Sequence, residues 1–168
     1  MKTLILVRHA KSSWKDSSLS DIERPLNKRG KRDAPFMGKV LQETGISIDK
    51  FIASPANRAL TTARHFAAAF GLHEEDDIQI EEIIYDGSSR SIMKFISDLD
   101  DDLETVMLFG HNPDFTSLAS IYSEEYFDNV PTCGIVCIDF DVYSWADTGE
   151  TLGKLRFYKY PKQYFKKK

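Results

Sequence analysis

The sequence predicts an α/β fold, a three-layer α/β/α sandwich with a mostly parallel central sheet. Short apolar runs within residues 4–7, 50–54 and 105–110 have the length and composition of strands buried on both faces. A stretch with helical features follows each of these runs, and strands that alternate with helices are typical of parallel sheets. With 168 residues the chain can bury a sizeable core, so we expect one domain over residues 1–168.

Composition excludes several functional classes. The hydrophobic fraction of 42% and the charged fraction of 29% are those of an ordinary soluble protein, and a net charge of −4 gives no reason to expect nucleic-acid binding. No apolar run approaches the ~18 residues that a membrane span needs, and the N-terminus has no signal-peptide pattern. We therefore expect a cytoplasmic protein without a membrane partner. No apolar surface stripe is left over, which favours a monomer, and residues 166–168 are interpreted as a solubilising basic tail.

The two cysteines are interpreted as small core residues. Cys133 and Cys137 are expected on one strand, where a spacing of four residues places them about 13 Å apart. This distance is too long for a disulfide, and two cysteines alone make a poor metal site.

The first half of the chain begins with the strand at residues 4–7, which runs into Arg8 and His9. A polar loop follows over residues 11–27, and loops of this length are often functional. Asn27 is expected to cap a helix over residues 28–44, in which Pro35 marks a kink or a late start. The strand at 50–54 then leads into an alanine-rich helix over 57–70.

The second half repeats this order and ends differently. Residues 78–85 alternate between apolar and acidic side chains, which predicts a half-exposed strand or extended segment, and Ser88 or Ser89 is expected to cap the next helix. The strand at 105–110 precedes a helix that opens at Asn112-Pro113. Two further strands are expected at 134–141 and 153–160, antiparallel to each other.

Polar side chains stand at the end of three predicted strands. Arg8 and His9 follow the first strand, Ser54 ends the second with Arg58 one helical turn later, and His111 follows the third. Ligands of open α/β sheets bind beyond the carboxyl ends of the strands, so these residues should meet at one edge. Each of them alone is an ordinary surface or core residue. Together, two guanidinium groups can hold a phosphoryl group, and a neutral imidazole can attack its phosphorus.

The motifs that carry these residues resemble a known family. Arg8-His9-Ala10 resembles the RHG signature of the histidine phosphatase (phosphoglycerate mutase-like) superfamily, with Ala10 in place of the usual glycine. The segment from Ser54-Pro55 to Thr62-Ala63 resembles its second motif, and Gly110-His111-Asn112-Pro113 resembles its late histidine motif. Arg24-Pro25-Leu26 with Arg29-Gly30, and the short chain, resemble the SixA-like branch, the phosphohistidine phosphatases. The resemblance implies a phosphoglycerate mutase-like fold.

The resemblance also implies a mechanism without a metal or another cofactor. His9 would attack phosphorus and carry the phosphoryl group, while Arg8, Arg58 and His111 would stabilise the charge of the transition state. Water would then release inorganic phosphate. His9 must be neutral at the attacking nitrogen, so its other ring nitrogen should donate to a backbone carbonyl.

A general acid for the leaving group is harder to place. Acid phosphatases of the superfamily have Asp directly after the second histidine, where this chain has Asn112. Glu82 stands near the place that supplies the acid in mutase-like members, Asp86 is close to it, and SixA-like proteins often lack a clear acid. A phosphorus–nitrogen bond needs less proton assistance than an alkyl phosphate does.

Other residues are expected to contact the substrate or shape the entrance. Ser13, or its neighbour Ser12, could donate to a phosphate oxygen, and Lys15 occupies the place of a phosphate-binding residue in relatives. Asn112 is a further substrate-binding candidate. Trp14 and Lys11 could shape the mouth, although Trp14 fits core packing equally well.

Three functions are compatible with this site. The first is a phosphatase that acts on phosphohistidine of a protein in signalling, because the short segment 86–110 leaves no insertion to roof the pocket. The second is a phosphatase of small phosphorylated metabolites, which would use the same residues. The third, a non-catalytic phosphate-binding adaptor, is disfavoured because both arginines and both histidines are present.

Overall fold

A six-stranded sheet forms the centre of the computed structural model, which describes residues 1–165. The strand order is β3-β2-β4-β1-β5-β6. Strands β1, β4, β2 and β3 pair in parallel, while β5 is antiparallel to β1 and β6 is antiparallel to β5. The strands are β1 (Lys2–Arg8), β2 (Lys50–Ala53), β3 (Ile78–Ile80), β4 (Thr105–Gly110), β5 (Ile135–Phe140) and β6 (Lys154–Lys159).

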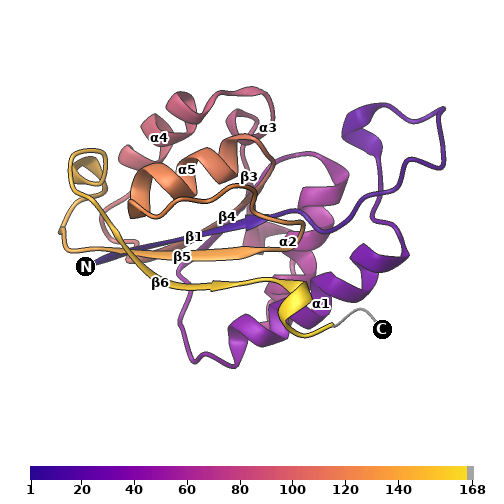
Figure 1. The fold of residues 1–168 in the computed structure, drawn as a ribbon, viewed down its shortest axis with the longest axis horizontal. Coiled ribbons are helices and arrows are strands. Elements are labelled where there is room, and N and C mark those ends of the chain that lie inside the picture. Colours follow the sequence, from indigo (N-terminus) through magenta and orange to yellow (C-terminus); the bar gives the residue numbers. More distant parts are fainter. Residues whose placement is uncertain (166–168) are drawn as a thin grey trace.

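Helices cover both faces of this sheet, as Figure 1 shows. Helices α1 and α2 lie on one face, and α4 and α5 lie on the other. The prediction of a three-layer α/β/α sandwich with a mostly parallel sheet is confirmed. The helices are α1 (Lys28–Gln42), α2 (Asn57–Ala69), α3 (Ile83–Asp86), α4 (Ser89–Ser97) and α5 (Asp114–Ser123).

Strand β1 shows why its apolar run is continuous. Ile5 and Val7 pack into the core below α1 and α2, whereas Leu4 and Leu6 pack into the core on the opposite face. Side chains alternate between the faces of a strand, so a strand that is covered on both faces must be apolar at every position. This burial fixes β1 in the sheet and thereby fixes the position of the residues that follow it.

Helix α1 begins where the sequence predicts. The side chain of Asn27 accepts a hydrogen bond from the backbone N–H of Gly30 at 2.9 Å, which is the expected cap. The helix runs from Lys28 through Pro35 without a late start, and ends at Gln42, two positions before the predicted end.

The predicted strand over residues 78–85 is wrong in its second half. Only Ile78–Ile80 is a strand, and Ile83–Asp86 forms one helical turn. Ile84 is buried against α4 and α5 by this turn, so packing overrides the alternating pattern. Ser88 caps α4, as expected.

The cysteines are buried and free, which confirms their interpretation as core residues. The expectation that both lie on one strand is wrong, because Cys133 precedes β5 and has a φ of 61°. Its N–H donates to the carbonyls of Arg8 and His9 at 3.0 and 3.1 Å. With this left-handed backbone conformation, Cys133 belongs to the loop that closes over the end of β1.

The interpretation of residues 166–168 as a solubilising tail lies outside the described residues. No helix of the described chain is long and apolar enough to cross a membrane.

Candidate active site

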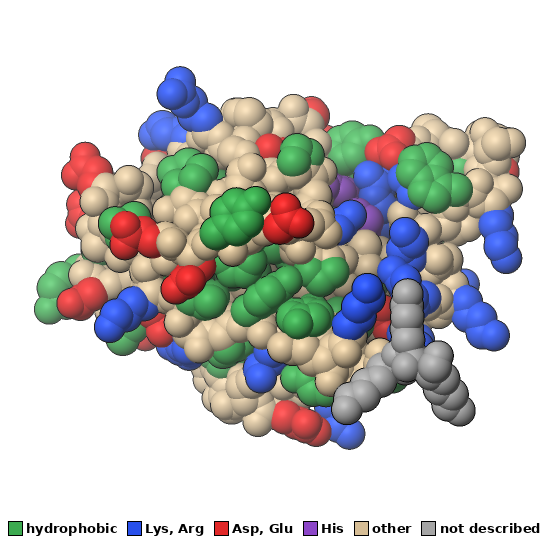
Figure 2. Space-filling view, in the orientation of Figure 1, with side chains coloured by type: hydrophobic (Ala, Val, Ile, Leu, Met, Phe, Trp, Pro, Cys, Tyr) green, Lys and Arg blue, Asp and Glu red, His purple; other side chains and the backbone are tan. Residues whose placement is uncertain are grey.

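The two histidines meet because β1 and β4 are parallel neighbours. Arg8 is in register with Gly110, so His9 and His111 each follow the end of adjacent strands. The N–H of His9 donates to the carbonyl of Gly110 at 3.0 Å, and the two imidazole rings lie 5.2 Å apart between their centroids. In Figure 2, histidine atoms are visible in a recess beside lysine and arginine side chains.

His9 is held in the neutral form that a nucleophile needs. The residue His9 is 8% exposed, and its Nδ1 lies 2.7 Å from the carbonyl oxygen of Ala10. Burial, with the nearby positive groups adding to it, lowers the pKa of His9 to about 3. Because a carbonyl can only accept, Nδ1 carries the proton and Nε2 keeps a free lone pair. The expected contact with a backbone carbonyl is therefore present.

His111 is oriented by the hydroxyl of Ser54. Nε2 of His111 and this hydroxyl form a hydrogen bond of 2.7 Å, and the backbone N–H of Ala56 donates to the same hydroxyl at 3.1 Å. Burial lowers the pKa of His111 to about 4, with Arg58 as the next cause, so this ring is also neutral at pH 7.

Two buried side-chain nitrogens at this edge have no hydrogen-bond partner within the described part of the protein. They are Nε of Arg8 and Nδ1 of His111. Arg8 is fixed by a 3.0 Å hydrogen bond from Nη1 to the carbonyl of Val130. Buried polar groups are almost always paired in proteins, so the unpaired N–H of Arg8 beside a nucleophilic nitrogen indicates an acceptor such as a phosphoryl oxygen.

Arg58 reaches the same edge from the first turn of α2. Its Nη1 donates to the carbonyl of Asp21 at 2.7 Å and its Nη2 to the Asp21 carboxylate at 3.0 Å. Thr62 ties α2 to the end of β1, because its hydroxyl accepts from the N–H of Ala10 and donates to the carbonyl of Arg58. Arg8, His9, Arg58 and His111, predicted from three separate motifs, thus converge.

Asp21 and Tyr85 also belong to the site, and sequence reasoning missed them. The Tyr85 hydroxyl donates to the Asp21 carboxylate at 2.8 Å, and its ring packs edge-on against His111 with 5.6 Å between centroids. Burial of Asp21 opposes ionisation, but hydrogen bonds from Tyr85, Arg24 and Arg58 outweigh it and lower its pKa to about 2. The signal in the sequence was an aspartate shortly before the Arg24-Pro25-Leu26 motif.

Within residues 1–165, no hydrogen bond joins the predicted substrate-binding residues of the 11–27 loop to His9 or His111. The Ser13 hydroxyl accepts from the N–H of Lys15 at 3.1 Å, and the Lys15 side chain is exposed. Ser12 is buried and pairs with Arg24. Trp14 is 74% exposed beneath the Arg24 guanidinium, so core packing of this ring is wrong. Substrate binding by Ser13 and Lys15 stays a prediction.

The candidate acids lie on the solvent side of the site. Glu82 and Asp86 flank the single turn of α3 and are exposed. Glu82 precedes Tyr85 by three positions, and residues with this spacing share a helix face. The role of Glu82 as a proton donor stays a prediction.

Asn112 makes four hydrogen bonds within the protein. Its Nδ2 donates to Asn129 and to the Val130 carbonyl, and its Oδ1 accepts from the N–H and hydroxyl of Thr116. The Val130 carbonyl is also the partner of Arg8, so Asn112 supports the arginine indirectly. Substrate binding by Asn112 is not tested by these contacts, which occupy its amide.

The positive charge of the site comes from arginines. Among residues 1–165, no cluster of three His, Cys, Asp or Glu side chains has the geometry to hold a metal ion. The buried neutral imidazole of His9, the two arginines and His111 can together bind a tetrahedral anion and attack it.

Comparisons with known proteins agree with this chemistry. Residues 4–101 match the histidine phosphatase superfamily (branch 1). An uncharacterized chloroplastic protein of Arabidopsis thaliana is 30% identical over 87% of this chain and 70% of its own length. The SixA protein of Agrobacterium tumefaciens has the same fold, with a TM-score of 0.81 and 23% identity over 95% of this chain and 98% of that chain. The structure of the protein histidine phosphatase SixA in complex with tungstate has a TM-score of 0.77 and 18% identity, over 93% of this chain and 95% of that chain.

Proposed function

The chain belongs to the histidine phosphatase superfamily, and from that premise we propose that it removes phosphoryl groups from phosphohistidine on a protein through a covalent intermediate on His9. Family membership supports phosphatase activity. The chemistry of the site supports the choice of substrate, and this choice is the finer part of the proposal.

The neutral state of His9 is the observation that carries the proposal. Nε2 has a free lone pair, because Nδ1 is committed to the Ala10 carbonyl. In the first step Nε2 bonds to phosphorus while the phosphorus–nitrogen bond of the substrate breaks. The substrate ring, protonated from solvent at its other nitrogen, keeps the electron pair of the broken bond and leaves as neutral imidazole. In the second step water bonds to phosphorus, the bond to Nε2 breaks, and inorganic phosphate leaves with His9 neutral again.

The charged and polar groups around His9 support the transition state. Nε of Arg8 is an unpaired donor beside the nucleophile, Nδ1 of His111 is also without a partner in the described residues, and Arg58 adds a second guanidinium. These groups are fixed before substrate arrives, by Val130, Ser54 and Asp21 respectively. Fixed donors that need no reorganisation usually supply the largest catalytic effect in such reactions.

The lack of a well-placed proton donor among the site residues favours phosphohistidine over an alkyl ester as the substrate. The residue after His111 is Asn112, whose amide is occupied by protein contacts and cannot supply a proton. The candidate acids Glu82 and Asp86 are exposed, and the Asp21 carboxyl bonded to Arg58 has a pKa lowered to about 2, so it carries no proton at pH 7. An imidazole leaves phosphorus with little proton assistance, whereas an alkoxide needs a well-placed acid.

Trapping of the phosphoenzyme tests the nucleophile. Rapid quenching of the wild-type enzyme with a phosphohistidine peptide should yield protein-bound phosphate that is labile to acid and stable to alkali. His9→Asn should yield none and should lose phosphate release. Unchanged phosphate release from His9→Asn would overturn the assignment of His9.

A substrate panel tests the finer claim. We expect kcat/KM for phosphohistidine peptides to exceed kcat/KM for a set of small phosphate esters. A clear preference for the esters would favour the alternative, a phosphatase of small metabolites. Cytoplasmic location and a monomeric state accompany the proposal as expectations, and sedimentation of the purified protein checks the second.

A further inference from the structure

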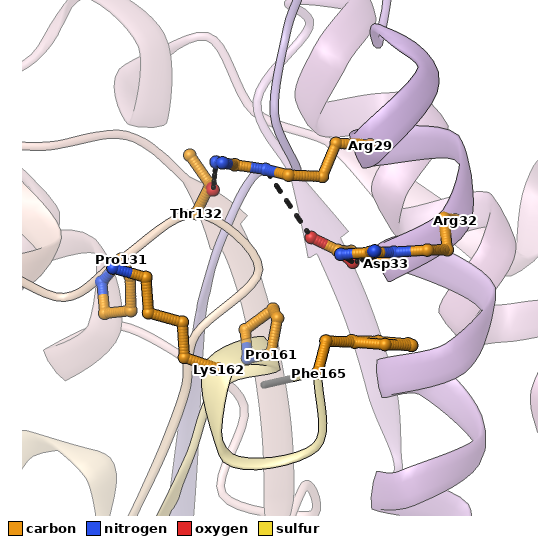
Figure 3. A pocket seen from close by; sticks show the side chains of 8 residues that line it. All are labelled: Arg29, Arg32, Asp33, Pro131, Thr132, Pro161, Lys162 and Phe165. Atoms are coloured by element: carbon orange, nitrogen blue, oxygen red, sulfur yellow. Dashed lines mark hydrogen bonds and ion pairs between the residues drawn. The ribbon is translucent and has the colours of Figure 1, made fainter. Parts of the chain in front are cut away.

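A cavity lies beside the candidate active site, between the start of α1, the loop before β5 and the end of the described chain. Its volume is about 260 Å³, and Figure 3 shows the side chains that surround it. This space exceeds that of a single water molecule several-fold, so it can accept a charged side chain. The lining residues are Arg29, Arg32, Asp33, Pro131, Thr132, Pro161, Lys162 and Phe165.

The lining of this cavity is electropositive. Three cations, Arg29, Arg32 and Lys162, face one carboxylate, Asp33, in a chain whose net charge is −4. Asp33 is buried and lies 2.9 Å from the Arg32 guanidinium and 4.0 Å from that of Arg29. One carboxylate therefore fixes two guanidinium groups and leaves an excess of positive charge.

The cations at the start of α1 lower the stability of this helix. Lys28, Arg29, Lys31 and Arg32 occupy four of its first five positions, and its first turn holds no acidic residue. The N-terminal end of a helix carries partial positive charge, so cations there are unfavourable and an anion is favoured. A cavity that adds Lys162 from another segment strengthens the attraction for a negative group.

Two contacts connect the cavity to the catalytic residues. Thr132, which accepts a 3.4 Å hydrogen bond from Arg29, directly precedes Cys133, whose N–H is bonded to the carbonyls of Arg8 and His9. On the other side, a Cβ on Gly30 would lie 2.2 Å from the carbonyl oxygen of Lys11, so the first turn of α1 rests against the segment after His9. The cavity is thus joined to the catalytic edge through the backbone at Thr132-Cys133 and at Gly30.

We propose that this cavity binds an acidic side chain of the protein that carries the phosphohistidine. The partner would place its phosphoryl group at His9 and a nearby Asp or Glu carboxylate among Arg29, Arg32 and Lys162. Arginine forks bind carboxylates through paired hydrogen bonds, and the Thr132 hydroxyl is within the same wall. This inference rests on the proposed function for its substrate, and it assigns a specificity site outside the catalytic residues.

Paired peptides and paired variants test this inference. One phosphohistidine peptide carries Asp and Glu beside the phosphorylated residue, and the other carries Asn and Gln. The test variant is Arg32→Gln with Lys162→Gln. The control is Lys39→Gln with Lys154→Gln, which removes the same charge from exposed positions outside the cavity.

The test variant should lower kcat/KM for the acidic peptide by about tenfold, because loss of a charged hydrogen bond costs roughly that factor. For the neutral peptide and for p-nitrophenyl phosphate, kcat/KM should stay within about twofold of wild type. The control should leave all three substrates unchanged. Equal losses for the acidic and neutral peptides would overturn the inference.

A binding measurement keeps this result separate from the proposed function. Fluorescence anisotropy of the unphosphorylated acidic peptide should show binding to the wild type that the test variant weakens, whether or not the enzyme turns over. Binding that the variant leaves unchanged, or binding of citrate but not of the peptide, would overturn the inference. Absence of turnover on every phosphorylated substrate, with peptide binding intact, would instead overturn the proposed function.

Discussion

The carboxylate of Asp21 lies 3.0 Å from the guanidinium of Arg58, although the two residues are 37 positions apart in the chain. The same carboxylate accepts from Tyr85 and Arg24. Asp21 comes from a short turn of the 11–27 loop, Arg58 from α2 and Tyr85 from α3. One loop residue, Asp21, therefore connects α2 to α3 at the candidate active site.

Replacement of Asp21 should reduce catalysis by displacing Arg58. In Asp21→Ala the guanidinium loses the carboxylate that fixes it, and displacement of a charged group by about 1 Å can cost up to about 100-fold in rate. We expect kcat/KM on p-nitrophenyl phosphate to fall by about 10- to 100-fold. Asp16→Ala is the matched control, because Asp16 belongs to the same loop and bonds only Ser18. Wild-type kcat/KM in Asp21→Ala would contradict a positioning role.

The two site histidines should stay neutral well below pH 6.5. Burial lowers the pKa of His9 to about 3 and that of His111 to about 4. In NMR titrations of histidine-labelled protein, neither ring should protonate as the pH falls from 7 to 5. A midpoint near 6.5 for either ring would contradict this expectation.

These depressed pKa values also predict the direction of the pH effect on stability. The unfolded chain binds protons at these histidines below about pH 6.5, while the folded chain does not until the pH nears 4 and then 3. The free energy of unfolding should therefore fall as the pH drops through this window. His9→Asn should reduce the dependence, which urea unfolding at pH 7 and pH 5 can measure.

The role of Glu82 depends on the leaving group. If Glu82 donates a proton, Glu82→Gln should slow hydrolysis of an alkyl phosphate by about 100-fold and leave phosphohistidine hydrolysis nearly unchanged. Asp86→Asn tests the other candidate acid, because Asp86 ends the same turn. Equal rates of wild type and Glu82→Gln on both substrates would exclude Glu82 as the acid.

Gly30 allows α1 to approach the segment that follows His9. A Cβ at this position would lie 2.2 Å from the carbonyl oxygen of Lys11, a backbone atom that cannot move aside alone. Gly30→Ala should lower the free energy of unfolding by about 1–3 kcal/mol, as overpacking does. Gly149→Ala is the control, since nothing lies within 4 Å of its added Cβ, and it should stay within about 0.5 kcal/mol of wild type. Equal stabilities of the two variants would contradict the close approach.

The sequence by itself determined the layers and the four central side chains. A run such as residues 4–7 is apolar at every position, and only a strand covered on both faces makes this pattern favourable. Parallel strands end at the same edge, so Arg8, His9 and His111 could be placed together before any coordinates were known. These rules are local, because each needs only a strand and the residue that follows it.

The tertiary structure alone decided the contacts that join distant loops. Asp21, Tyr85 and Ser54 act through partners that are 37 to 64 positions away. Sequence periodicity also assigned Ile84 to a strand, whereas packing against α4 and α5 placed it in a helical turn. Propensity and periodicity describe neighbours along the chain, but a hydrogen bond between loops depends on where the whole core places their backbones, and this is why only the folded structure shows which residues hold the arginines and histidines in place.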